Sequence, residues 1–174
     1  MNEVGMTMLT VIISAFVGSV TTLFVEKTKL KYRLQVENEY KILMRIWEKA
    51  YWLKSRANNL RPLQDRCDLT ELPTDRHKRR LGQLENAMNE FEQEMYLNKP
   101  FYPQEIHDLL KELKTLADME GFGYAETSPN RGDHNYRSEY WEEAKKNAAN
   151  IDGVVDRICN AIQHRIHENP SDAM

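Results

Sequence analysis

Two polar side chains near the C-terminus, Arg157 and His164, are of types that together suit cleavage of RNA without a metal. Arg157 and His164 are seven residues apart and Asn160 lies between them, so on a helix all three fall near one stripe. A histidine of near-neutral pKa can move the proton of a ribose 2′-hydroxyl. An arginine can orient the adjacent phosphate and stabilise the charge that develops on it. A catalytic pair is thus one interpretation. The other is the polar face of an ordinary amphipathic helix, which has the same composition and which the spacing favours.

The helix that carries these residues is predicted from Ser138, a good N-cap, to the stop at Asn169-Pro170. Its apolar residues recur at helical spacing on the side away from Arg157. They are Ile151, Val155, Ile158, Ile162 and Ile166. Asn150, Gly153 and His167 fall near the polar stripe instead. One face of this helix is thus predicted to pack and the other to face solvent.

Motifs for other kinds of chemistry are absent from the sequence. It has no phosphate-binding loop, dinucleotide fingerprint, nucleophile elbow or zinc signature, so no cofactor and no metal site are predicted. Histidine is scarce: His107 is expected on a helix surface and His134 in a loop. His77 lies in the basic run 75–80, which either attracts phosphate or forms a solvated first helical turn.

The composition bounds the class of protein. The 174 residues suit one modest domain with an appendage, and the net charge of −3 gives no global attraction to nucleic acid. Two cysteines, Cys67 and Cys159, exclude a disulfide scaffold and fit free thiols in a reducing cytoplasm.

The N-terminal region is predicted to cross a membrane. Residues 4–25 carry no charged side chain, and the 20 residues Met6–Val25 span about 30 Å as a helix, the thickness of a bilayer core. Basic residues follow the span at Lys27, Lys29, Lys31 and Arg33. Because basic flanks stay in the cytoplasm, the N-terminus is expected outside and the rest of the chain inside. Residues 1–27 are therefore predicted to form a single-pass anchor.

The side chains of this span are sorted around its axis. Small and hydroxyl-bearing residues share an arc of about 120°; they are Thr7, Thr10, Ser14, Gly18, Thr21 and Thr22. Small residues allow close approach of helices, and hydroxyls find partners across such an interface. The arc predicts a homo-oligomer, either a dimer or trimer of packed helices or a ring whose hydroxyl face lines a water-filled path.

The cytoplasmic part is predicted to be an all-α bundle of four helices. Residues 28–61 form a long juxtamembrane helix that can continue the span, with its apolar residues at Val36, Tyr40, Leu43, Trp47, Ala50 and Leu53, and a stop at Arg61-Pro62. Residues 62–169 complete the bundle, and 170–174 are expected to be disordered. A second helix covers about 74–97, and a third runs from Pro103 to Gly121. Residues 121–137 are predicted to be one long loop, and the three tryptophans, Trp47, Trp52 and Trp141, to lie in the core or at a protomer interface.

The pair Arg157 and His164, with six residues between them late in an all-α domain, resembles the R-x(4–6)-H motif of the HEPN superfamily of helical domains. A short domain of this kind behind one membrane span is similar to the membrane accessory proteins of type VI-B CRISPR systems. That resemblance implies a divergent HEPN fold, antiviral defence beside an RNA-guided RNase effector, and a ring in the bacterial inner membrane that perturbs the membrane on activation. Arg157, Asn160 and His164 would carry over as the motif residues, and RNA as an additional partner.

Three hypotheses of function follow. The first is an oligomeric membrane protein that forms a pore or changes the membrane potential, which the sorted face of the span independently favours. The second is a membrane-tethered, metal-independent HEPN ribonuclease; Ile158, directly after Arg157, departs from the pattern of active members. The third is a non-enzymatic tether that holds a helical interaction module at the bilayer.

Overall fold

The computed structural model describes the backbone of residues 3–61, 71–126 and 134–168, and the side chains of residues 22–61, 71–126 and 141–167. The chain divides into two compact units, residues 1–39 and 40–174. The predicted small face of the span lies almost wholly outside the described side chains, with Thr22 as the exception. The homo-oligomer that it predicts therefore stays a prediction.

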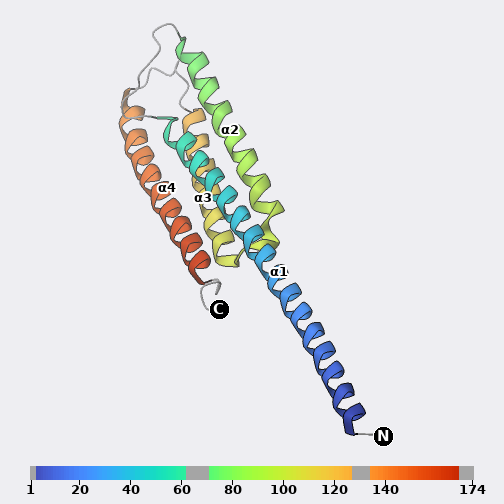
Figure 1. Cartoon of the computed structure of the whole chain (residues 1–174). Coiled ribbons are helices and arrows are strands. Elements are labelled where there is room, and N and C mark those ends of the chain that lie inside the picture. The colour runs from blue at the N-terminus through green and yellow to red at the C-terminus, as the bar shows by residue number, and fades with distance from the viewer. Residues whose placement is uncertain (1–2, 62–70, 127–133, 169–174) are drawn as a thin grey trace. The chain divides into compact units, whose positions relative to one another are not determined.

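The fold is all-α, as the hydrophobic periodicity predicts. The described elements are α1 (Glu3–Asn58), α2 (Pro73–Leu97), a 3₁₀ turn η1 (Lys99–Phe101), α3 (Gln104–Glu126) and α4 (His134–Glu168), without any strand in these residues. From residue 40 onward the four helices lie side by side (Figure 1). Two ion pairs show which helices are neighbours. Lys49 of α1 pairs with Glu90 of α2, and Lys114 of α3 pairs with Glu92 of α2.

Within residues 1–39 the described side chains are mostly exposed, including Leu23, Phe24 and Leu30 at 59–74%. Among the residues that the structure describes, no helix is sufficiently long and apolar to cross a bilayer. Most of the predicted span, residues 6–21, lies outside the described side chains.

The core of the second unit is built from the stripes that the sequence indicates. Its largest fully buried side chains come from all four helices: Phe91, Leu43, Ile46, Leu53, Leu60, Met95, Ile106, Leu110, Leu113, Ile151, Ile158 and His107. The stripe of α1 is rotated from the predicted one, however. Tyr40 is 48% exposed, whereas Ile42 and Ile46 are buried. An aromatic ring at position 40 satisfies the helical pattern, but only tertiary packing decides which edge of the stripe is covered.

The tryptophans do not form the core. Trp47 packs against its edge, while Trp52 is 46% and Trp141 37% exposed. The guanidinium of Arg56 lies 5.6 Å from the centre of a Trp52 ring, a distance typical of a cation–π contact. Of the two predicted places, the edge of the core is thus found for Trp47, whereas a protomer interface stays the prediction for Trp52 and Trp141.

The predicted loop at residues 121–137 is mostly helical. α3 continues through Gly121 to Glu126 rather than ending at Gly121, and α4 begins at His134 rather than Ser138. Only residues 127–133 remain between the two helices. Tyr124 is buried and stacks on His77 of α2, with ring centres 4.4 Å apart. Such contacts stabilise the last turns of α3 and outweigh the low helix propensity of glycine.

Gly121 is required for close packing, not for a helix end. No described glycine has a positive φ, so the expected left-handed cap is absent there. A Cβ added at Gly121 would lie 2.8 Å from Leu84 Cδ2 of α2, whereas one added at Gly153 would meet nothing within 4 Å. Leu84 is 2% exposed, so it has little room to move aside.

Gly121→Ala is therefore expected to destabilise the bundle by about 1 kcal/mol, because overpacking outweighs the gain in helix propensity. Gly153→Ala is expected to stabilise it by up to about 1 kcal/mol through propensity alone. Urea denaturation of the full-length protein in detergent, followed by circular dichroism, measures both. Equal stabilisation by the two substitutions would contradict the close approach of α2 and α3.

Candidate functional site

The exposed face of α4 presents the residues that the sequence singles out. Arg157, Asn160 and His164 are all exposed. Asn150, Gly153 and His167 are exposed beside them, while Ile151, Val155, Ile158 and Ile162 are buried on the opposite side. The predicted division of this helix into a packing face and a polar face is confirmed.

Arg157 has a partner that the sequence does not indicate. Its Nη2 lies 2.5 Å from Oε1 of Glu112, on the neighbouring helix α3. Both side chains are about half exposed, at 53% and 46%, so the ion pair is screened by water and contributes at most about 1 kcal/mol. An incoming phosphate could therefore replace Glu112 on the guanidinium at modest cost. No spacing rule relates residue 112 to residue 157, which explains why sequence reasoning missed it.

The two motif residues stand two helical turns apart. Seven residues correspond to a rise of about 10.5 Å along α4. Arg157 and His164 thus lie on one face of α4, but the helix by itself does not bring their side chains into contact. To act on the same phosphodiester, the two side chains would have to converge. In the described part of the chain, no group of three or more His, Cys, Asp or Glu side chains could hold a metal ion.

His107 is not on the surface, as the sequence suggests, but buried to 1% exposure in the corner between α2 and α3. The hydroxyl of Tyr102 donates a hydrogen bond to the carbonyl oxygen of Met95 and lies 3.3 Å from His107 Nδ1. The ring of Tyr96 meets the imidazole edge-on, with centres 6.2 Å apart. The acidic neighbours in sequence, Glu105 and Asp108, favour a surface position. In the structure, however, His107 is buried together with the preceding residue, Ile106.

Burial changes the acid–base properties of this corner. Desolvation lowers the pKa of His107, and the nearby cations Lys99 and Lys111 lower it further, while Asp108 acts in the opposite direction. Burial also raises the pKa of Tyr102 to about 12. The imidazole is therefore held neutral in the folded protein at neutral pH.

The basic run at the start of α2 has structural partners. Nε of Arg79 lies 2.7 Å from Oε1 of Glu71, and Arg76 reaches the same carboxylate at 3.4 Å. The hydrogen bond from Arg79 is the main reason why the pKa of Glu71 is lowered. Arg80 donates to the carbonyl oxygen of Leu60 at the end of α1.

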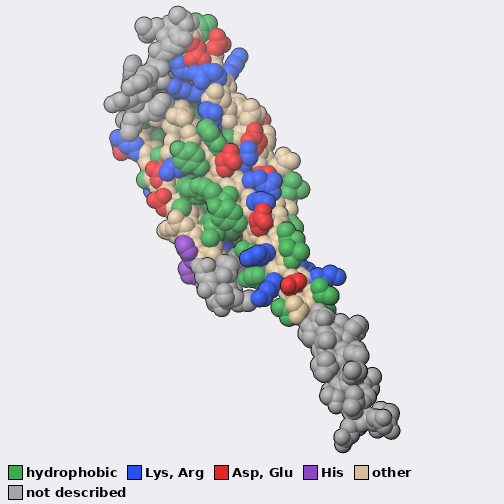
Figure 2. Space-filling view, in the orientation of Figure 1, with side chains coloured by type: hydrophobic (Ala, Val, Ile, Leu, Met, Phe, Trp, Pro, Cys, Tyr) green, Lys and Arg blue, Asp and Glu red, His purple; other side chains and the backbone are tan. Residues whose placement is uncertain are grey.

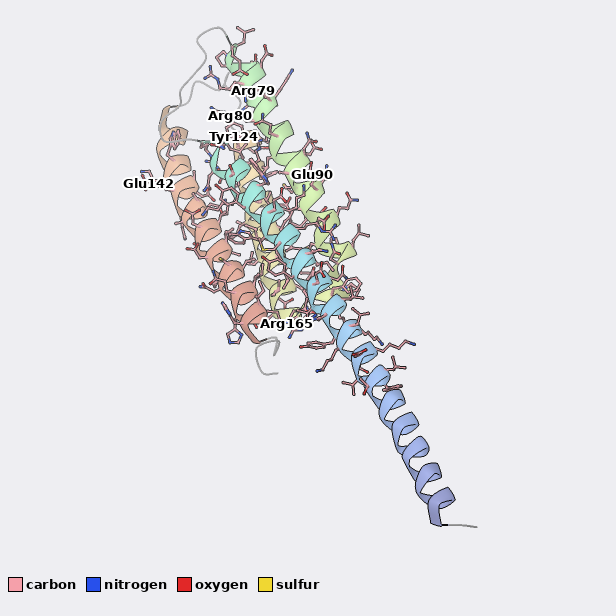
Figure 3. The ribbon with its side chains drawn as sticks, viewed as in Figure 1. Arg79, Arg80, Glu90, Tyr124, Glu142 and Arg165 are labelled. Atoms are coloured by element: carbon pink, nitrogen blue, oxygen red, sulfur yellow. The ribbon has the colours of Figure 1, made fainter. Side chains whose placement is uncertain are left out.

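Figure 3 places Arg79, Arg80 and Tyr124 at the same end of the bundle. His77, in the same run, is stacked on Tyr124, and desolvation lowers its pKa. The run therefore fastens α2 to its neighbours. Asp75, Lys78 and Arg79 of this run are nevertheless exposed, which agrees in part with the predicted solvated turn. The attraction of phosphate stays a prediction.

A second buried polar group lies nearby. Arg61 and Glu120 form an ion pair whose side chains are 8% and 6% exposed, with Nη2 and Oε1 2.7 Å apart. Asn147 of α4 donates to the other carboxylate oxygen at 2.9 Å. This network joins the end of α1 to α3 and α4, and its residues belong to no sequence motif.

Comparisons with known proteins give no relative: the chain matches no family profile, no curated protein and no solved structure.

Proposed function

We propose that this protein is a membrane-anchored, self-assembling accessory effector of antiviral defence, of the type VI-B CRISPR class that its architecture resembles. Residues 6–25 would anchor it in the bacterial inner membrane with the N-terminus outside. The helical bundle would lie in the cytoplasm, where an RNA-guided RNase effector could activate it. Assembly of several copies would then form a pore or change the membrane potential.

The observation that carries this proposal is an apolar surface on the bundle itself. Tyr40, Met44 and Tyr51 of α1 are 42–53% exposed and share one side of the helix with the partly buried Trp47. We call these four residues the α1 stripe. Hydrophobic side chains gather in the middle of the face that α1 and α4 present in Figure 2.

The α1 stripe lies on the α4 side of its helix. Asn58 follows Tyr51 by two turns and donates a hydrogen bond to Asp152 of α4 at 3.2 Å. Aromatic residues and methionine are enriched in the buried centres of protein interfaces. Exposed together, they favour contact with another copy. Because α1 (Glu3–Asn58) also carries the whole predicted span, Met6–Val25, one helix would supply both the membrane contact and the cytoplasmic contact of an assembly.

The first test is the mass of the full-length protein in detergent, by light scattering with the detergent contribution subtracted. We expect a discrete assembly of six or more copies, followed by ion leakage from vesicles that contain it. A monomer would favour the tether. A dimer would favour the second candidate, a membrane-tethered ribonuclease, which rests on the shared exposure of Arg157, Asn160 and His164.

Met44→Glu is expected to reduce the mass of the assembly, because a carboxylate in the centre of an apolar interface would be buried without a partner. Met119→Glu is the matched control: Met119 is also an exposed methionine, at 58%, but lies on α3. The same light-scattering measurement compares the two. An unchanged mass for Met44→Glu, or an equal loss in both variants, would contradict a role for the α1 stripe.

A further inference from the structure

The corner between α2 and α3 contains a buried side chain whose hydrogen bonding is incomplete. α2 ends at Leu97, Asn98 caps it, and η1 leads through Tyr102 into α3. Asn98 Nδ2 donates to the carbonyl oxygen of Glu94 at 3.0 Å. His107 lies one turn into α3, and among the described residues its buried Nε2 has no hydrogen-bond partner.

The contacts of Tyr102 assign the tautomer of His107. A hydroxyl has one proton, and Tyr102 gives it to the carbonyl oxygen of Met95. The hydroxyl oxygen can then only accept from His107, so the imidazole proton must be on Nδ1. Nε2 therefore carries a lone pair, and a proton added there would produce a buried cation whose new N–H has no acceptor.

From this geometry we propose that His107 is a pH-sensitive switch: its protonation under mildly acidic conditions opens the corner formed by residues 95–103 while the rest of the bundle stays folded. This inference does not depend on the proposed membrane function. It requires only the burial of His107, its bond to Tyr102 and the lone Nε2.

The charged groups around the ring favour opening upon protonation. Lys99 of η1 and Lys111 of α3 would repel an imidazolium, and Asp108 of α3 is the acidic group of the described chain that acts on it. The side chains in ring contact with the imidazole are Tyr96 and Tyr102, and neither offers a carboxylate that could pair with an imidazolium. Opening brings the imidazolium into water, where its charge is stabilised.

Three apolar side chains of the corner are already exposed when it is closed. Tyr96, Leu97 and Phe101 are 54%, 66% and 52% exposed, so opening exposes little additional apolar surface from these three residues. Tyr102 and Met95 are the buried members that it releases. The centre of α4, by contrast, has Ile151, Val154, Val155 and Ile158 buried together. A local opening is therefore expected before global unfolding.

The sign and size of the effect follow from linkage. The pKa of His107 is lowered in the closed corner and is about 6.5 when the ring is exposed. Below about pH 6.5 the open form binds a proton that the closed form does not, so closure weakens as pH falls towards the lowered value. The upper limit applies when the closed form binds no proton over this range: opening then becomes about tenfold more favourable between pH 7.5 and 5.5.

Hydrogen exchange of the full-length protein in detergent, read by mass spectrometry and corrected for intrinsic exchange rates, tests this directly. We expect protection of residues 95–107 to fall by up to about tenfold between pH 7.5 and 5.5, while residues 151–158 stay unchanged. His107→Asn should remove the fall, since an amide can still donate to Tyr102 but does not titrate. His77→Asn, at the far end of α2, should leave it intact.

Three results would overturn the proposal: constant protection in the wild type, the same fall in His107→Asn, or an equal fall in residues 151–158. If His107→Asn does not fold, NMR of the wild type decides. The proton must be found on Nδ1 at neutral pH, and protection of residues 95–107 must fall as the His107 ring protonates.

Discussion

Replacing Arg61 with methionine is expected to lower the free energy of unfolding by about 3–5 kcal/mol. The substitution removes a cation whose side chain is 8% exposed and leaves the carboxylate of Glu120, 6% exposed, without its charged partner. Asn147 alone would then bond to Glu120. One amide hydrogen bond does not offset the free energy that a buried carboxylate loses when it is removed from water. Most of the destabilisation therefore comes from the unpaired charge of Glu120. Chemical denaturation followed by circular dichroism measures the change.

Two comparison variants make this prediction specific. Lys49→Met breaks the pair with Glu90, whose side chains are 28% and 61% exposed, and should cost no more than about 1 kcal/mol. Arg61→Met combined with Glu120→Gln should recover much of the lost stability, because the amide keeps an acceptor for Asn147 and carries no charge. A small loss in Arg61→Met, comparable to that in Lys49→Met, would show that water reaches the Arg61–Glu120 pair.

Phe91→Ala is expected to destabilise the bundle by about 3–5 kcal/mol. Phe91 is 1% exposed and is among the largest fully buried side chains of the described core. Its removal loses the favourable free energy of transferring the ring from water to the core. It also leaves a cavity, which the packed helices around it cannot close completely. We expect a matching drop in the thermal midpoint, measured by circular dichroism in detergent.

Phe122→Ala is the matched control for this effect. Phe122 is 71% exposed on α3, so the same change in side chain should alter stability by about 0.5 kcal/mol or less. If both substitutions destabilise equally, Phe122 is covered in the protein as it assembles, by a second copy or another partner. If neither does, α2 does not pack as described.

Periodicity predicted most of the core but not its exact edge. The stripe of α4 follows from apolar spacing, and Ile151, Ile158 and Ile162 are buried as predicted. On α1 the same reasoning favours Tyr40, whereas Ile42 and Ile46 are the buried residues. Tyrosine, tryptophan and methionine fit either a core or an interface, so a one-dimensional pattern does not distinguish the two.

The sequence also predicted only part of the candidate site: which residues are exposed, but not which residues they contact. The exposed positions of Arg157, Asn160 and His164 follow from helical geometry within one element. Glu112, the partner of Arg157, comes from another helix, and only packing relates the two positions. The burial of His107 has the same origin, since its acidic neighbours suggest a surface and the corner between α2 and α3 encloses it.

What the sequence by itself determined is local: an all-α chain, a second helix over about residues 74–97, the packing face of α4 and the polar face opposite to it. These depend on the spacing of residues within a helix, which is fixed by the backbone repeat. Tertiary structure alone decided which polar groups meet. Arg61 with Glu120, Tyr102 with His107, and Gly121 against Leu84 each join separate segments. Their energies depend on burial and on distances across helices, which no spacing along the chain encodes.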